Sequence, residues 1–161
     1  MENMFIDPLK NLLPYKNLLK DIENNTTPIS THGIIDEAIG HMVYALNQNA
    51  NRQVLVITHS ENRAKTIYED IKNFNGEGAE IFPTREMLFY KIDAISSERH
   101  NQRLKVLSRF VEGETMVLVA SIESLLDRLM DPKLFKKYSI SINMDSIINL
   151  EELSNKLINC G

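Results

Sequence analysis

One short stretch of the chain carries residue types that could hold a metal-bound nucleotide. The residues from Thr31 to His41 read THGIIDEAIGH, in which two isoleucines lead into Asp36 and Glu37. Adjacent carboxylates after an apolar run are a combination that ATPases use to hold magnesium and polarise water. The stretch therefore raises the hypothesis that the chain hydrolyses a nucleotide.

A nucleotide site also needs a cradle for the phosphates, and the sequence lacks the residues for one. Such a cradle consists of glycines followed by Lys-Ser/Thr at a strand-to-helix turn, where backbone amides and the lysine bind the phosphates. The turn here contains one glycine, Gly33, and no Lys or Arg occurs between Lys20 and Arg52. Two like charges 4 Å apart repel by about 4 kcal/mol at an effective dielectric constant near 20. We therefore predict that Asp36 and Glu37 begin a helix beside a lost phosphate loop and bind no cofactor.

The other candidate groups favour structural roles over catalysis. The four histidines show no spacing with an acid or a cysteine that would form a metal site, so no metal is predicted. Ser30, Ser60 and Ser121 follow predicted strands, where nucleophiles often lie. None of them lies in Gly-x-Ser-x-Gly, and all three suit helix caps or turns. We therefore predict no catalytic residue in this chain.

Composition is typical of a globular protein. The net charge of −4 argues against a generally basic surface for nucleic acid. No apolar run approaches the roughly 20 residues that a membrane helix requires. The start, MENMFIDPLK, contains acids and lacks the apolar core of a signal peptide. We therefore expect a cytoplasmic protein without a membrane partner.

Strand-like and helix-like patterns alternate along most of the chain. Continuous β-branched runs predict buried strands, whereas apolar residues three or four apart predict amphipathic helices. Strands are predicted near Ile29 and at 53–58, 79–83 and 116–121, and helices at 35–46, 60–75, 98–112 and from 121 onward. Parallel strands need such crossovers, so we predict an α/β three-layer sandwich with a mainly parallel sheet. Its outline is that of a RecA-like fold that lacks a functional phosphate loop.

The two ends of the chain depart from this alternation. The stretch DPLKNLLPYKNLLKDIENN predicts two short helices separated by Pro14. Near the other end, KKYSISINMDSI alternates like a strand and LEELSNKLINCG has the spacing of a helix. We therefore expect N-terminal helices over 1–27, the α/β domain over 28–132 and the start of a truncated small α+β domain over 133–161.

A modest basic stretch follows the second predicted strand and is interrupted by acids. The interleaved acids favour a solvated helix face with ion pairs, and the alternative is a contact surface for another domain. Glu86 and Arg103 could pair and fix the loop to the helix. The basic residues are Arg85, Lys91, Arg99, Arg103, Lys105 and Arg109.

The same stretch carries a family resemblance. The pattern Phe-Pro-x-x-Glu-x-x-x-Tyr is matched by Phe82, Pro83, Glu86 and Tyr90, and Arg103 followed by a leucine lies in the next helix. An apolar strand and a Leu-rich segment ending at Asp-Pro come next, and DPLKN, QVLVITHS and YEDI fit upstream. In this order the motifs resemble the N-terminal region of the bacterial transcription-repair coupling factors, the Mfd family, over essentially the whole chain.

The resemblance implies a role in DNA repair without catalysis by this chain. In that family the N-terminal region is similar to the damage-recognition protein UvrB, with its ATP site lost. The full-length protein is an ATP-dependent DNA translocase that releases RNA polymerase stalled at lesions and recruits UvrA for nucleotide excision repair. ATP and magnesium are then expected only in motor domains outside this chain, as are the contacts with RNA polymerase and DNA. The small domain that begins near Ser139 resembles the one that docks UvrA, and the family's contact residues are expected after the point where this chain stops.

Three hypotheses follow for the function. The first is an interaction module that supports the UvrA-docking domain and packs against other domains of the same protein. The second is a working nucleotide-binding domain of a UvrB-related helicase, which the missing cation argues against. The third is binding of damaged DNA. UvrB uses a long Tyr-rich hairpin for this, and the stretch between Pro83 and Glu98 has no room for one.

Overall fold

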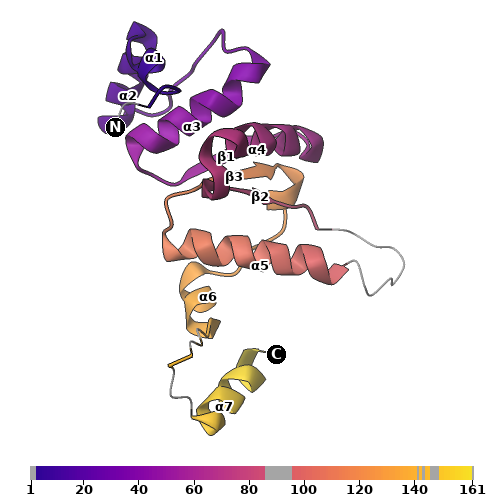
Figure 1. The fold of residues 1–161 in the computed structure, drawn as a ribbon. Helices are drawn as coiled ribbons and strands as arrows, with labels where there is room; N and C mark the ends of the chain where they lie inside the picture. The colour runs from indigo at the N-terminus through magenta and orange to yellow at the C-terminus, as the bar shows by residue number, and fades with distance from the viewer. Residues whose placement is uncertain (1–2, 86–95, 141, 143, 146–148, 161) are drawn as a thin grey trace. The chain divides into compact units, whose positions relative to one another are not determined.

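Three parallel strands form the centre of the fold. The computed structural model describes residues 3–85, 96–140, 142, 144–145 and 149–160. The strands β1 (Val54–Thr58), β2 (Ala79–Phe82) and β3 (Val117–Ser121) lie in the order β1-β3-β2 (Figure 1). In the register, Val119 of β3 faces Val56 of β1 and Ile81 of β2. The predicted α/β class and the strands predicted at 53–58, 79–83 and 116–121 are confirmed. The predicted burial of the strand at 53–58 is wrong for one of its faces, because Leu55 and Ile57 of this edge strand are exposed.

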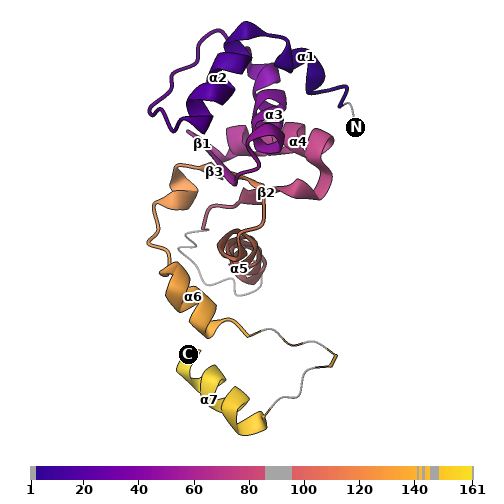
Figure 2. The same cartoon turned by 90° about the vertical axis from the view of Figure 1, so that its left-hand side faces the viewer.

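Helices cover both faces of this sheet. The crossover from β1 to β2 contains α4 (Glu61–Asn75), and the return from β2 to β3 contains α5 (Ser96–Glu112). Right-handed crossovers in opposite directions place their helices on opposite faces, as seen from two sides (Figure 1 and Figure 2). On the α4 face, Ile67 and Ile71 pack against Val117 and Val119. On the α5 face, Val106 packs with side chains of β2 and β3.

A third helix, α3 (Ile39–Ala50), packs against α4 through a glycine. A Cβ atom added at Gly40 would lie 2.6 Å from the Cβ atom of Asp70 and 3.4 Å from the nearest backbone atoms of α4. Two carbon atoms that are not bonded to each other cannot lie only 2.6 Å apart. The absence of a side chain at Gly40 therefore sets how near these two helices come.

We expect Gly40→Ala to lower the free energy of unfolding by roughly 1 kcal/mol. The strain of overpacking, about 1–3 kcal/mol, exceeds the helix propensity of about 1 kcal/mol that alanine adds. Denaturant unfolding measures the change. The second substitution Asp70→Gly should restore part of the loss in the Gly40→Ala background, whereas Asp70→Ala should not, because alanine keeps the Cβ atom. Equal effects of the two second substitutions would contradict this explanation.

Two short N-terminal helices, α1 (Asp7–Lys10) and α2 (Leu13–Glu23), belong to the same compact unit as the sheet. Tyr15 of α2 is buried with Tyr44 and Ala45 of α3. The Tyr15 hydroxyl accepts a hydrogen bond of 2.8 Å from Asn49, and burial raises the pKa of this phenol above its usual value. Pro14 lies within the first turn of α2 and not between the helices as predicted, because proline is tolerated where no helical N–H bond is required.

We expect Tyr15→Phe to destabilise the protein by about 1 kcal/mol near neutral pH through loss of the hydrogen bond. Above pH 10 the unfolded chain releases the phenolic proton while folded Tyr15 keeps it, because the folded pKa is the higher one. The tyrosine's contribution is complete below pH 10 and is lost as the pH rises through the folded pKa. Denaturant unfolding of both proteins between pH 7 and 11 should therefore show the difference shrinking. A constant difference would contradict the expectation.

The remaining residues, Arg128–Gly161, form a second compact unit. It contains α6 (Pro132–Tyr138), capped by the Asp131 side chain, and α7 (Leu150–Cys160). The predicted C-terminal helix is confirmed. The strand predicted within KKYSISINMDSI is wrong at its start, which belongs to α6, and part of its remainder lies outside the described residues.

Two further predictions are corrected. No strand forms near Ile29, where the chain between α2 and the short 3-10 helix η1 (Asp36–Ala38) is irregular. The helix predicted from residue 121 onward is reduced to one 3-10 turn, η3 (Glu123–Leu125). Among the described residues, no helix is both long and apolar enough to cross a membrane.

Candidate functional site

The carboxyl ends of the three strands lie side by side at one end of the sheet. Because the sheet is parallel, the residues that follow β1, β2 and β3 lie side by side there. In open α/β sheets, ligands usually bind at the carboxyl ends of the strands. A ligand site of this sheet is therefore expected among the residues that follow the strands.

Arg103 joins two of these strand ends. Its guanidinium, carried by α5, donates hydrogen bonds to the carbonyl oxygens of Pro83 at 2.6 Å and Ser124 at 3.1 Å. It also lies 4.0 Å from the centre of the Phe82 ring. Three of the family-motif residues, Phe82, Pro83 and Arg103, are thus brought together by the fold.

Arg103 is held in an environment that is unusual for an arginine. The residue is only 6% exposed. Burial lowers the pKa of its guanidinium, and the charge of the Asp127 carboxylate opposes this shift. Arginine nevertheless stays protonated in proteins. Its charge is compensated by carbonyl dipoles and an aromatic face, so it acts as a clasp that fixes the ends of β2 and β3.

The turn after β3 is closed by two buried serines. The Ser121 hydroxyl accepts a hydrogen bond from the Ser124 backbone N–H at 3.2 Å, and the Ser124 hydroxyl donates to the Ser121 carbonyl at 2.7 Å. Ser60 caps α4 by accepting from the Arg63 backbone N–H. The predicted cap and turn roles of Ser60 and Ser121 are confirmed by these bonds.

A second group of polar residues, around Glu61, lies at the same end of the sheet. Glu61, the first residue of α4, accepts hydrogen bonds from the Thr84 hydroxyl and from Arg99, the latter at 3.0 Å. These contacts join the start of α4 to the segment after β2 and to the start of α5. Glu61 is therefore engaged by a cation and a hydroxyl of the protein itself.

Asp36 and Glu37 begin a helical segment. They are the first two residues of η1, which leads directly into α3. The Asp36 carboxylate forms an ion pair of 2.9 Å with Arg63 of α4. Gly33 adopts a positive φ of 80°, and a Cβ atom there would meet nothing within 4 Å. Since the chain before η1 is not a strand, the strand-to-helix turn of a phosphate cradle is not formed by the described residues around Gly33.

Two of the motif residues, Glu86 and Tyr90, lie outside the described residues, so the suggested Glu86–Arg103 pair is untested. In the part of the chain that is described, no group of three or more His, Cys, Asp or Glu side chains is arranged to hold a metal ion.

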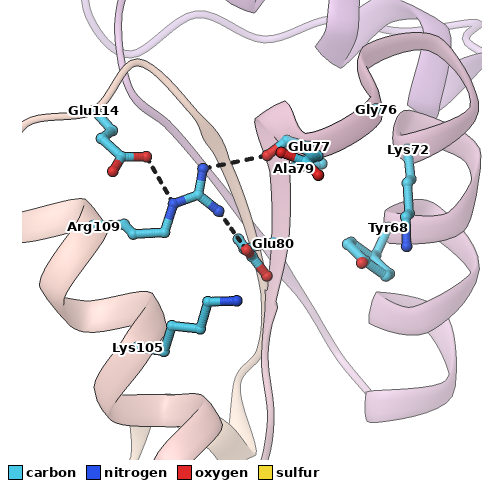
Figure 3. A pocket seen from close by; sticks show the side chains of 9 residues that line it. All are labelled: Tyr68, Lys72, Gly76, Glu77, Ala79, Glu80, Lys105, Arg109 and Glu114. Carbon is cyan, nitrogen blue, oxygen red and sulfur yellow. Dashed lines mark hydrogen bonds and ion pairs between the residues drawn. The ribbon is translucent and has the colours of Figure 1, made fainter.

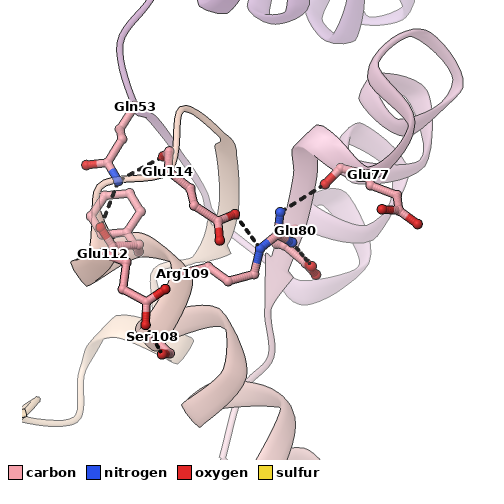
Figure 4. A network of polar contacts seen from close by, with 8 residues as sticks. Gln53, Glu77, Glu80, Ser108, Arg109, Glu112 and Glu114 are labelled. Atoms are coloured by element: carbon pink, nitrogen blue, oxygen red, sulfur yellow. Dashed lines mark hydrogen bonds and ion pairs between the residues drawn. The ribbon is translucent and has the colours of Figure 1, made fainter. Parts of the chain in front are cut away.

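Arg109 forms a network at the opposite end of the sheet (Figure 4). It makes an ion pair with Glu80 of β2, another of 2.7 Å with Glu114, and a hydrogen bond to the Glu77 carbonyl. The hydrogen bond with Glu114 is the main reason that the pKa of Arg109 is raised. Arg109 thus joins the end of α5 to β2.

Sequence reasoning missed the partners of these arginines. It assigned the basic stretch to a solvated face paired with nearby acids, whereas Arg109 and Arg99 pair with acids at the start of β2 and α4. One signal could have identified Arg103. It lies three and four residues before Val106 and Leu107, which places it on the apolar face of α5.

Comparisons with known proteins agree with the motif pattern. No family model and no solved structure matches the chain. The transcription-repair-coupling factor of Bacillus subtilis is 22% identical over 148 residues, 91% of this chain and 13% of that protein. UvrABC system protein B of Borreliella afzelii is 23% identical over 85% of this chain and 23% of that protein. UvrABC system protein B of Levilactobacillus brevis is 26% identical over 70% of this chain and 19% of that protein. The chain spans less than a quarter of the length of these relatives.

Proposed function

We propose that this Mfd/UvrB-like region of a DNA repair protein is a non-catalytic interaction module. The observation that carries the proposal is the start of α3. There Asp36 is paired with Arg63, the preceding chain forms no strand, and the sequence contains no Lys or Arg from residue 21 to 51. The cation beside Asp36, Arg63, is already paired, and the stretch lacks the lysine with which a phosphate loop neutralises the β and γ phosphates of ATP.

The sheet also offers a surface for contact with another protein segment. Leu55 and Ile57 of β1 are 45% and 54% exposed, and Ile122 after β3 is 49% exposed. Leu55 is in register with Leu118, so it lies on the α5 face of the sheet. Helix α5 packs over β2 and β3, and among the described residues this face of β1 stays about half exposed. Adjacent exposed apolar side chains on a strand favour burial by another protein surface.

In the proposed role, residues 28–132 form the inactive UvrB-like domain, with helices over 1–27 before it. Residues 133–161 begin a small domain that takes part in docking UvrA. The motif resemblance and the similarity to the transcription-repair-coupling factor support this organisation. Contacts with RNA polymerase and DNA, together with the hydrolysis of ATP with magnesium, belong in this proposal to other domains of the full-length protein.

Isothermal titration calorimetry with ATP and MgCl₂ tests the proposal. We expect no measurable heat of binding for the full 161-residue chain at concentrations up to about 1 mM, a range in which nucleotide-binding domains saturate. An active ATPase with a phosphate loop serves as the positive control, and the variant Asp36→Asn shows whether the carboxylate alone prevents binding. Binding with micromolar affinity at a 1:1 ratio would refute the proposal.

A second candidate, binding of damaged DNA, is favoured by the matches to UvrABC system protein B. The same chain can be titrated with a lesion-bearing duplex and with an undamaged one at two salt concentrations. Preferential, salt-sensitive binding to the lesion would support this candidate. Under our first proposal the two duplexes bind equally weakly, in keeping with the net charge of −4.

A further inference from the structure

A pocket of about 400 Å³ lies beside the start of β2, between α4 and α5 (Figure 3). Ala79 and Glu80 of β2 form part of its lining, with Tyr68 and Lys72 from α4 and Lys105 from α5. All of these residues belong to the first compact unit. The pocket is separate from the clasp of Arg103, which lies at the other end of the strands.

β2 is an edge strand among the described residues. It pairs with β3 on one side, and the sheet order ends there. The backbone N–H and C=O groups on the other side are available to a further strand. Since α4 and α5 lie on opposite faces of the sheet, they form the two walls of a groove along this edge. An extended peptide can add to such an edge by main-chain hydrogen bonds.

Three cations (Lys72, Lys105 and Arg109) and three acids (Glu77, Glu80 and Glu114) line the pocket, so the two lysines, and not a net positive charge, select the side chains of the peptide. Arg109 is already paired with Glu80 and Glu114. Lys72 lies 5.6 Å from the centre of the Tyr68 ring, and among the described residues neither Lys72 nor Lys105 has an acidic partner. The two lysines lie on opposite sides of β2 (Figure 3). Each wall of the groove therefore offers one unpaired ammonium group.

We propose that the open edge of β2 binds an extended segment of a partner protein that carries two adjacent acidic side chains. Successive side chains of a strand point to opposite faces of a sheet. Two consecutive acids would therefore reach Lys72 on one wall and Lys105 on the other. Acids two residues apart would point to the same wall and leave one lysine unpaired. The proposal does not depend on whether the chain binds nucleotide.

The test uses two fluorescein-labelled, Thr-rich peptides of about ten residues and the full chain. One peptide carries adjacent Glu-Asp at its centre, and the other has one Thr between the two acids. Fluorescence anisotropy should show tighter binding of the first peptide, by up to about fivefold, since this is the most that one exposed charged contact contributes. Amide NMR shifts on its addition should centre on Ala79–Phe82.

Charge reversal on each wall provides the matched comparison. Lys72→Glu and Lys105→Glu should each weaken binding of the adjacent-acid peptide about tenfold. Lys65→Glu, on an exposed position of α4 outside the pocket lining, changes the net charge equally and should leave the affinity within about twofold. Circular dichroism confirms that each variant is folded. Failure of the peptide to bind, equal affinities of the two peptides, or an equal effect of Lys65→Glu would each overturn the proposal.

Discussion

Replacement of Arg103 by methionine should lower the free energy of unfolding by about 3 kcal/mol. Methionine can fill the space beside Phe82, but it cannot donate to the Pro83 and Ser124 carbonyls. Leaving buried carbonyl groups without a donor costs about 1–3 kcal/mol each. Denaturant unfolding followed by circular dichroism measures the loss. Amide exchange should also become faster at the ends of β2 and β3, since the clasp holds them together.

Two variants show whether the clasp or the charge accounts for this effect. Arg103→Lys keeps the charge, but a single ammonium lacks the planar fork of donors and the stacking surface of a guanidinium. We expect it to recover less than half of the loss. Arg85→Met removes a well-exposed arginine whose carboxylate partner, Asp127, is 3.9 Å away, and should change stability by less than about 0.5 kcal/mol. Equal effects of Arg103→Met and Arg85→Met would contradict the structural role of Arg103.

Truncation of Ile71 to alanine should destabilise the protein by about 3 kcal/mol. Ile71 is fully buried in the layer between α4 and the sheet, where it packs in a cluster with Val117 and Val119. Removing its outer carbons loses the transfer free energy of these groups and leaves a cavity, a combination that costs about 2–5 kcal/mol in protein cores. The measurement is again the denaturant midpoint at a constant slope.

Two substitutions with smaller expected effects serve as controls for this prediction. Ile71→Val removes one methylene group and should cost about 1 kcal/mol. Ile122→Ala removes the same atoms as Ile71→Ala from a side chain that is half exposed, and should cost less than about 1 kcal/mol. If Ile122→Ala proved as destabilising as Ile71→Ala, Ile122 would be buried in solution, and its part of the proposed contact surface would be wrong.

Local patterns were sufficient to predict the α/β core. The β-branched runs predicted the strands β1 and β3, although only β3 is buried on both faces. The apolar residues of α4 and α5 repeat every three to four residues, which is the spacing of a helix face. Shorter elements were less predictable. The 3-10 turn η3 forms where a longer helix was predicted, and α6 occupies the start of a predicted strand. Short apolar runs are compatible with either a helix or a strand.

The features of the candidate site were likewise predicted only in part from the sequence. The sequence by itself determined that Asp36 and Glu37 have no lysine or arginine near them in the chain, since a missing residue type can be read without coordinates. It also gave the motif Phe82-Pro83 and, further on, Arg103. Only the tertiary structure decided that Arg103 is buried against both residues and that Asp36 pairs with Arg63. A contact between distant residues depends on how the crossover helices pack on the sheet, and this information is not contained in the spacing along either segment.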